Sequence, residues 1–325
     1  MQATSGNVLD MEINVSPTFS SVSGDMRINL RLIAVFGHVI ICFENVSELA
    51  AIRLEDEPLW DGQAKSSRYQ NFASDRWFVP GQIRGSETEA LYEGILRSLG
   101  DVYRLLHEPL KQFLAEREPR PESMKQADYD RTIAARAFDI TRYLLPLAAK
   151  TNVGQVVSIR TLEKQITRLL SSQLSELRAI GEDLKDACQR PPVNLWGELC
   201  GQAAGLSDPL APTLARHAKA NAYQETVYAD LARHAKEVLR GTGLDQPGNW
   251  GSVESVELIE PHHPLDELAA TLLYRVAQAP YRKILKVVSE WSEKEKQATI
   301  EVAMRQRGPY DELIKEFRSG YAFTF

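Results

Sequence analysis

Cysteine is scarce in this chain. The 325 residues include three cysteines, Cys42, Cys188 and Cys200, and they lie too far apart in the sequence to give the paired spacing of a zinc site. The low count excludes a disulfide-stabilised scaffold and fits a reducing compartment. His262 and His263 stand between prolines, with no third ligand nearby in the sequence. We therefore predict no bound metal.

Long apolar runs and an excess of positive charge are also missing. No apolar segment approaches the roughly 20 residues of a membrane span, and the N-terminus lacks the basic segment and apolar core of a secretory signal. The net charge is −6, so the chain has no general electrostatic surface for nucleic acid. We expect a cytoplasmic protein that binds neither membrane nor nucleic acid.

The common short motifs for phosphates and nucleophiles are absent as well. The sequence contains no GxGxxG, no P-loop and no GxSxG. Its content of 43% hydrophobic and 25% charged residues is that of a soluble protein with a real core. An anion site in such a chain must come from a local group of Arg and Lys residues.

The order of patterns predicts an α+β fold. Segments between residues 10 and 50 alternate apolar and polar residues or are rich in β-branched residues, which favours an N-terminal antiparallel sheet. Residues 53–85 contain several prolines and glycines and are interpreted as an irregular site loop. Helical periodicity follows, starting at Ser86 as the N-cap and reaching about residue 116, with a kink expected at Pro109.

Further helices are predicted along the rest of the chain. They cover about 125–145, 156–171, 173–189 and 207–240, and then parts of 261–306, with a short strand at 252–260 and a strand-like end. We predict an α+β module at 1–190 (sheet 10–50, site loop 53–85, helices 86–190). Residues 191–325 would form a mostly helical extension, or the start of a second module.

The site loop contains the run Lys65-Ser66-Ser67-Arg68-Tyr69. A serine hydroxyl close to an arginine suits a phosphate, because the hydroxyl gives a short hydrogen bond and the guanidinium a fixed fork of donors. A surface loop with an unrelated arginine is the alternative. The aromatic residues Trp60 and Trp77 flank this loop and could stack on a flat ring or belong to the core.

A second group of cations lies on the predicted helix 156–171. Arg160, Lys164 and Arg168 are spaced i, i+4, i+8, so they share one face over about 12 Å, while Ile159, Leu162, Ile166 and Leu169 form the buried stripe. Arg142 ends the preceding helix, where it would cap that helix or pair with Asp139. These cations form either a solvated basic face or, with Ser66 and Arg68, a phosphate clamp made by Arg142 and Arg168.

The segments HVIICFENVSELAA, SSRYQNFASDRWFVPG and TRYLLPLAAKTNVGQVVSIRTLEKQITRLLSSQLSELR resemble, in this order, parts of flavin-dependent thymidylate synthases. The resemblance covers about residues 36–180. It implies an α+β fold in a homotetramer, and reductive methylation of dUMP to dTMP. FAD would be the flavin, and NADPH and methylenetetrahydrofolate would be co-substrates.

The resemblance also implies roles for single residues. Ser66, Arg68 and Arg142 would hold the dUMP phosphate, and Arg168 would approach the nucleotide as the catalytic residue. Arg160 would approach the flavin. Ser158 and Lys164 occupy positions where the family has asparagines, and we group them with Arg160 as flavin-binding candidates.

One part of the family signature is missing from the chain. The family has an Arg-His-Arg triplet about a dozen residues before S-x-R-Y, and those residues contact the flavin, whereas this chain has acidic and apolar residues around Glu55 to Pro58. Some longer members of the family look like two such modules in tandem, and the first of their two modules also lacks the basic triplet. The chain therefore resembles the first module of such a member, in a naturally short, truncated or degenerate form.

The missing triplet leaves three hypotheses. The chain is a flavin-dependent thymidylate synthase-like enzyme, or a non-catalytic nucleotide-binding or scaffolding module that has lost the flavin site. In the third hypothesis it is a helical interaction protein whose arginines are surface charge only. A homo-oligomer is expected from the family-like interface.

Overall fold

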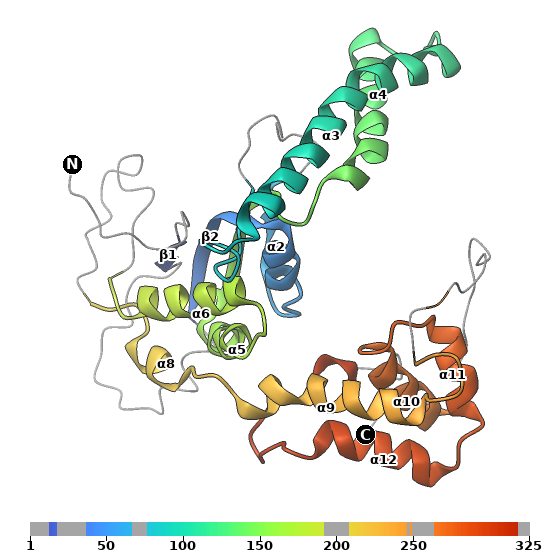
Figure 1. Cartoon of the computed structure of the whole chain (residues 1–325). Helices are drawn as coiled ribbons and strands as arrows, with labels where there is room; N and C mark the ends of the chain where they lie inside the picture. Colours follow the sequence, from blue (N-terminus) through green and yellow to red (C-terminus); the bar gives the residue numbers. More distant parts are fainter. Residues whose placement is uncertain are drawn as a thin grey trace. The chain divides into compact units, whose positions relative to one another are not determined.

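A computed structural model describes residues 13–17, 37–66, 77–191, 208–245, 248 and 263–317 of the chain (Figure 1). The contacts divide it into two compact units. The first unit comprises Met1–Leu170 and Leu174–Lys219, and the second comprises Ser171–Gln173 and Ala220–Phe325. This division falls later than the predicted module boundary at residue 190, because helix α8 (Pro212–His217) packs in the core of the first unit.

An antiparallel sheet forms the centre of the first unit, in agreement with the predicted fold class. The strand order is β1-β2-β4-β3, with antiparallel pairing throughout. The strands are β1 (Ile13–Pro17), β2 (His38–Ser47), β3 (Asp61–Ala64) and β4 (Lys150–Ser158). The predicted strand in 26–36 lies outside the described residues. Two of the strands, β3 and β4, were not predicted.

The central strand β4 sets the geometry of the site region. It pairs with β2 from His38↔Ser158 to Ser47↔Lys150 and with β3 on its other side. This second pairing requires a glycine, because a Cβ atom on Gly62 would lie 2.1 Å from the carbonyl oxygen of Gly154. The loop prediction for 53–85 is therefore wrong at β3, where a glycine-containing segment becomes the edge strand.

Helix α2 (Glu48–Glu55) directly follows β2. The Ser47 hydroxyl accepts a hydrogen bond from the backbone N–H of Ala50 at 3.0 Å, so Ser47 is the N-cap of this helix. The prediction of strand up to residue 50 is wrong here. The β-branched run ends at Ser47 because a capping residue and the acidic Glu48 favour a helix start.

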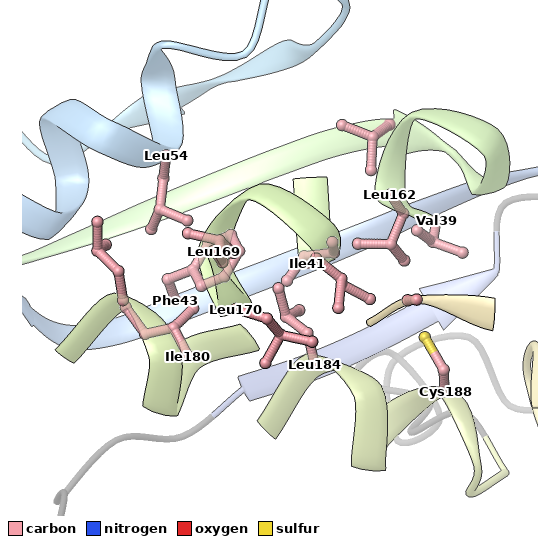
Figure 2. Close-up of a cluster of buried hydrophobic side chains, with 14 of the residues drawn as sticks. Val39, Ile41, Phe43, Leu54, Leu162, Leu169, Leu170, Ile180, Leu184 and Cys188 are labelled. Carbon is pink, nitrogen blue, oxygen red and sulfur yellow. The ribbon is translucent and has the colours of Figure 1, made fainter. Parts of the chain in front are cut away.

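The core of the first unit lies between the sheet and helices α5 (Ile159–Leu170) and α6 (Ser175–Cys188). Figure 2 shows its side chains, among them Ile41 and Phe43 from β2, Leu162 and Leu169 from α5, and Ile180 from α6. The two predicted helices 156–171 and 173–189 are confirmed. The first begins at Ile159, because the residues before it pair with β2 and β3.

Cys188 closes one end of this core. Its side chain is buried, and the burial raises the pKa of the thiol to about 12. Since the thiolate is the reactive form of cysteine, Cys188 is a packing residue and not a nucleophile.

A helical hairpin extends from the sheet. It consists of α3 (Glu89–Arg117) and α4 (Gln126–Thr141), which pack through Tyr103 and Phe138 and, further along, Leu114 and Ile133. The predicted N-cap is wrong: the Ser86 hydroxyl donates to the carbonyl oxygen of Ile83, and α3 begins at Glu89.

The second unit is helical. Its elements are α9 (Ala222–Val238), α10 (Pro264–Tyr274), α11 (Tyr281–Ser289), α12 (Glu293–Met304) and the 3₁₀ turn η3 (Lys315–Phe317). The predicted helix 207–240 is two helices, α8 and α9, and α11 was not predicted. His263 caps α10 by accepting the backbone N–H of Leu265. The strand predicted at 252–260 and residues 318–325 lie outside the described residues.

Where the structure describes the chain, no helix combines the length and the hydropathy that crossing a bilayer requires.

Candidate functional site

Ser66 lies at the end of β4 that begins with Lys150. The preceding residue fixes this position, because the Lys65 backbone N–H donates to the carbonyl oxygen of Asn152 at 2.8 Å. The Thr151 hydroxyl donates to the Lys65 carbonyl at 3.4 Å. The chain thus leaves the sheet with the exposed Ser66 next to the start of β4. Arg68 lies outside the described residues.

Arg142 reaches the same end of β4 from helix α4. It is the first residue of the 3₁₀ turn η2 (Arg142–Leu144), which leads toward β4. Its guanidinium lies 3.7 Å from the Asp139 carboxylate, and its side chain is 52% exposed. The predicted pairing with Asp139 is therefore present, but it is a long contact at the surface, which contributes at most about 1 kcal/mol.

The charge of Arg142 also acts on Glu48, at the N-terminus of α2. Burial and then the Glu55 carboxylate raise the pKa of Glu48, whereas the Arg142 guanidinium lowers it. Glu48 is tied to the start of β4, because its backbone N–H donates to the carbonyl oxygen of Ala149 at 2.8 Å. These contacts place the Arg142 charge close to the edge from which Ser66 emerges.

Arg168 lies in the last turn of α5 and forms an ion pair with Glu57. Helix α5 follows β4 directly and turns back beside it, because the Gln165 side chain contacts Gln155. The Glu57 side chain is 4% exposed and the Arg168 side chain 32% exposed. The Glu57 carboxylate thus lies deeper in the protein than the Arg168 side chain that it contacts. The predicted row of three cations is divided, because Arg160 and Lys164 are exposed while Arg168 is held by an acid.

On the same helix as Arg168, polar side chains of α5 contact β4. The Gln165 side-chain Nε2 donates to the side-chain Oε1 of Gln155 at 3.1 Å, and both side chains are buried. The Ser158 and Thr161 hydroxyls lie 2.9 Å apart. Sequence reasoning missed these contacts, although Thr161, Gln165 and Arg168 are spaced four and three apart beside the apolar stripe. That spacing is the signal that could have revealed them.

The flavin candidates lie away from Ser66. The Ser158 hydroxyl accepts the backbone N–H of Thr161 at 3.1 Å and so caps α5. Ser158 ends β4, eight residues after Lys150, which corresponds to about 26 Å at ~3.3 Å per residue. Arg160 follows in the first turn of α5. Within one copy of the chain, Ser158 and Arg160 therefore lie at the opposite end of β4 from Ser66.

A buried carboxylate lies behind the start of β4. Glu176, in the first turn of α6, accepts hydrogen bonds from the Ser47 backbone at 2.8 Å and from the Ser47 hydroxyl at 2.6 Å. Burial raises the pKa of Glu176, while the two hydrogen bonds and the charge of Lys150 lower it. No sequence pattern indicates this contact, which ties α6 to the junction of β2 and α2.

The two aromatic residues beside the site loop belong to the core. The Trp60 indole N–H donates to the carbonyl oxygen of Glu55 at 3.0 Å, and its ring packs against the main hydrophobic cluster. Trp77 forms an isolated bridge with Ala149 and packs against Tyr103 and Phe138. Of the two interpretations of these rings, the structure supports core packing.

The residues around Glu57 do not fit a flavin diphosphate. Where the resembling family has three basic residues, this chain has Asp56, Glu57 and Pro58 after Glu55. The buried Glu57 carboxylate is directed at Arg168, so it adds negative charge where a diphosphate would need cations. This segment therefore supports a fixed arginine and not a bound flavin.

Comparison with known proteins gives limited matches. No family model matches the chain. A UPF0159 protein of Chlamydia pneumoniae is 28% identical over 153 residues, which are 45% of this chain and 29% of the relative. A UPF0159 protein of Chlamydia muridarum is 30% identical over 155 residues, again 45% and 29%. The match thus spans less than a third of the length of these relatives.

Two solved structures are also similar. One is Thymidylate Synthase X (ThyX) from Helicobacter pylori with FAD and dUMP, at 17% identity and a TM-score of 0.32, covering 55% of this chain and 92% of that one. The other is the UMP/dUMP methylase PolB from Streptomyces cacaoi with 5-Br UMP, at 14% identity and 0.34, covering 64% and 94%. These TM-scores are too low to establish a shared fold.

Proposed function

We propose that this chain is a nucleotide-binding module of the flavin-dependent thymidylate synthase type, which takes the phosphate of dUMP at the Lys150 end of β4. Ser66, Arg68 and Arg142 hold the phosphate, and Arg168 approaches the nucleotide. The supporting observation is that Ser66 and the charge of Arg142 both lie by the Lys150 end of β4. Arg168 is held by Glu57, on the segment that leads into β3.

The chemistry of these side chains suits a phosphate monoester. The exposed Ser66 hydroxyl is a short donor, and arginine forms bidentate hydrogen bonds with phosphate oxygens. Arg142 is half exposed and its ion pair with Asp139 is a long surface contact, so a dianion can compete for it at little cost. The pair of Arg168 with Glu57 is compatible with this role, because a guanidinium has five N–H donors.

The proposal assigns no flavin to this chain on its own. If FAD is bound, Arg160, Ser158 and Lys164 would be its contacts, and the flavin would supply hydride transfer during the methylation. The acidic segment at Glu55 to Pro58 does not fit that group, so we assign the chain nucleotide binding without a flavin of its own.

The complete reaction is the second candidate. It would convert dUMP to dTMP with FAD, NADPH and methylenetetrahydrofolate in a homo-oligomer. One observation favours it: Arg160 and Lys164 are exposed, and Arg160 lies at the opposite end of β4 from Ser66. In a homo-oligomer, these residues of one copy could therefore serve the nucleotide end of another.

Calorimetric titration of the full chain with dUMP and with deoxyuridine tests the proposal. We expect dUMP to bind and deoxyuridine to bind at least tenfold more weakly, since a charged hydrogen bond to phosphate is worth about 1.5–3 kcal/mol. Arg142→Ala should weaken dUMP binding by a similar factor. Equal affinities for the two compounds, or no binding of either, would refute a phosphate site.

A matched control is available on the same helix. Arg131 pairs with Asp128 at 3.6 Å, also as an i,i+3 pair, and is 80% exposed, so Arg131→Ala should leave dUMP binding unchanged. The flavin question is decided separately, by incubation with excess FAD, desalting and an absorption spectrum. Retained flavin together with NADPH oxidation would favour the second candidate.

A further inference from the structure

We infer that Glu57 is a positioning residue that holds Arg168 in place for the nucleotide, an inference that rests on the proposed function. In this account the acidic segment before S-x-R-Y supports the nucleotide site from inside the protein. The observation is the ion pair between the two side chains, of which the carboxylate is buried and the guanidinium partly exposed.

The contact lies at one end of the guanidinium. Arg168 Nη2 and Glu57 Oε2, the two atoms of the ion pair, are both shielded from solvent. The Arg168 side chain as a whole nevertheless keeps about a third of its exposure. Part of the Arg168 side chain is thus accessible from solvent, whereas the two atoms of the ion pair are not.

Competition between Glu57 and a phosphate is the alternative, and the burial argues against it. A phosphate that displaced the carboxylate would leave a buried charge without its cation, which is strongly unfavourable. A phosphate that binds Arg168 without displacing Glu57 leaves the ion pair intact, and the guanidinium then interacts with two anions. The buried carboxylate then orients the arginine before the ligand arrives, which lowers the entropic cost of binding.

The segment that carries Glu57 is itself held in place. Leu59 donates its backbone N–H to Glu57 Oε1 at 3.4 Å, and the Trp60 indole donates to the carbonyl oxygen of Glu55 at 3.0 Å. The next residues enter β3, where Gly62 packs closely against Gly154. A short connection between a capped helix and a paired strand can thus fix the position of a long, flexible arginine side chain.

Binding of dUMP and deoxyuridine to the full-length Glu57→Gln variant tests the inference. We expect about tenfold weaker dUMP binding, the equivalent of immobilising one long side chain, and unchanged deoxyuridine binding. Glu55→Gln, which removes the same charge from the same segment, should bind both compounds like the wild type. In an Arg168→Ala background, Glu57→Gln should have no further effect on dUMP.

Each outcome has one meaning. If the wild type binds no nucleotide, the proposed function fails and the inference fails with it. If the wild type binds dUMP and Glu57→Gln binds it equally well or more tightly, only the inference fails. Equal weakening of dUMP and deoxyuridine would show a merely structural role and would also overturn it. If Glu57→Gln does not fold, Glu57→Asp, which keeps the charge on a shorter side chain, is measured by the same criteria.

Discussion

Replacing Arg168 with alanine removes the cation that faces a buried carboxylate. Breaking a fully buried ion pair by deleting one partner costs about 3–5 kcal/mol, because the other charge is left without compensation. Arg168 is 32% exposed while Glu57 is almost fully covered, so water can reach the remaining carboxylate in part. We therefore expect Arg168→Ala to lower the free energy of unfolding of the first unit by about 2–3 kcal/mol.

The assay has to separate the two units, since a chain of two units need not unfold in one step. Hydrogen exchange of peptides from β4 and α5, measured under native conditions across a urea series, reports the opening of the first unit alone. Arg131→Ala serves as the control, because its surface pair with Asp128 should contribute less than about 1 kcal/mol. The double variant Arg168→Ala, Glu57→Gln should regain at least half of the loss.

One result would refute this reasoning. If Arg168→Ala destabilises the first unit no more than Arg131→Ala does, the Glu57 carboxylate is not buried against Arg168 in solution. If the double variant is as unstable as Arg168→Ala, the loss comes from the removed side-chain stem and not from an uncompensated charge.

Three other predictions concern the pH response, the sheet and the assembly. Burial raises the folded-state pKa of Glu176 above its ordinary value. The wild type should therefore gain stability relative to Glu176→Gln as pH falls from 7 through the raised pKa to about 4.5, the ordinary pKa of the side chain. A pH-independent difference in urea unfolding would contradict this. Gly62→Ala should lower the free energy of unfolding, measured by thermal unfolding, by at least about 2 kcal/mol, because its Cβ would lie 2.1 Å from the Gly154 carbonyl oxygen. Gly94→Ala on α3, where open space surrounds the added Cβ, should instead raise it by about 0.5–1 kcal/mol. Leu105→Glu, on the exposed apolar face of α3 with Leu91 and Ile95, should shift the expected homo-oligomer toward monomer in light scattering, and an unchanged mass would place the interface elsewhere.

Part of the fold could be predicted because its signals are periodic. The apolar stripe of α5 is an example: Leu162, Ile166 and Leu169 recur every three or four residues and are buried in the core. Strand β4 carries a weaker signal. Its buried positions include Gln155 and Thr151 as well as valines, so the alternation of burial is hidden by polar residues that find partners only in the folded chain.

The candidate site shows the same limit. The local position of each residue could be predicted from the sequence. Ser66 follows a loop-like segment, and Arg142 and Arg168 each lie at a helix end. The partner of Arg168 could not be predicted, because Glu57 lies about half of the first unit earlier in the chain and the pairing depends on how α5 folds back along β4. From the sequence, the segment from Glu55 to Pro58 could be recognised only as lacking the basic residues that contact the flavin. In the structure, Glu57 of this segment pairs with Arg168.

The most direct test of the nucleotide site is hydrogen exchange of the full chain with and without saturating dUMP. We predict protection of peptides that cover residues 61–66 and 142–150, no protection of the first turn of α5 at Ser158 to Lys164, and no protection by deoxyuridine at the same concentration. Protection confined to the second unit, or equal protection by both compounds, would contradict a phosphate site at the Lys150 end of β4.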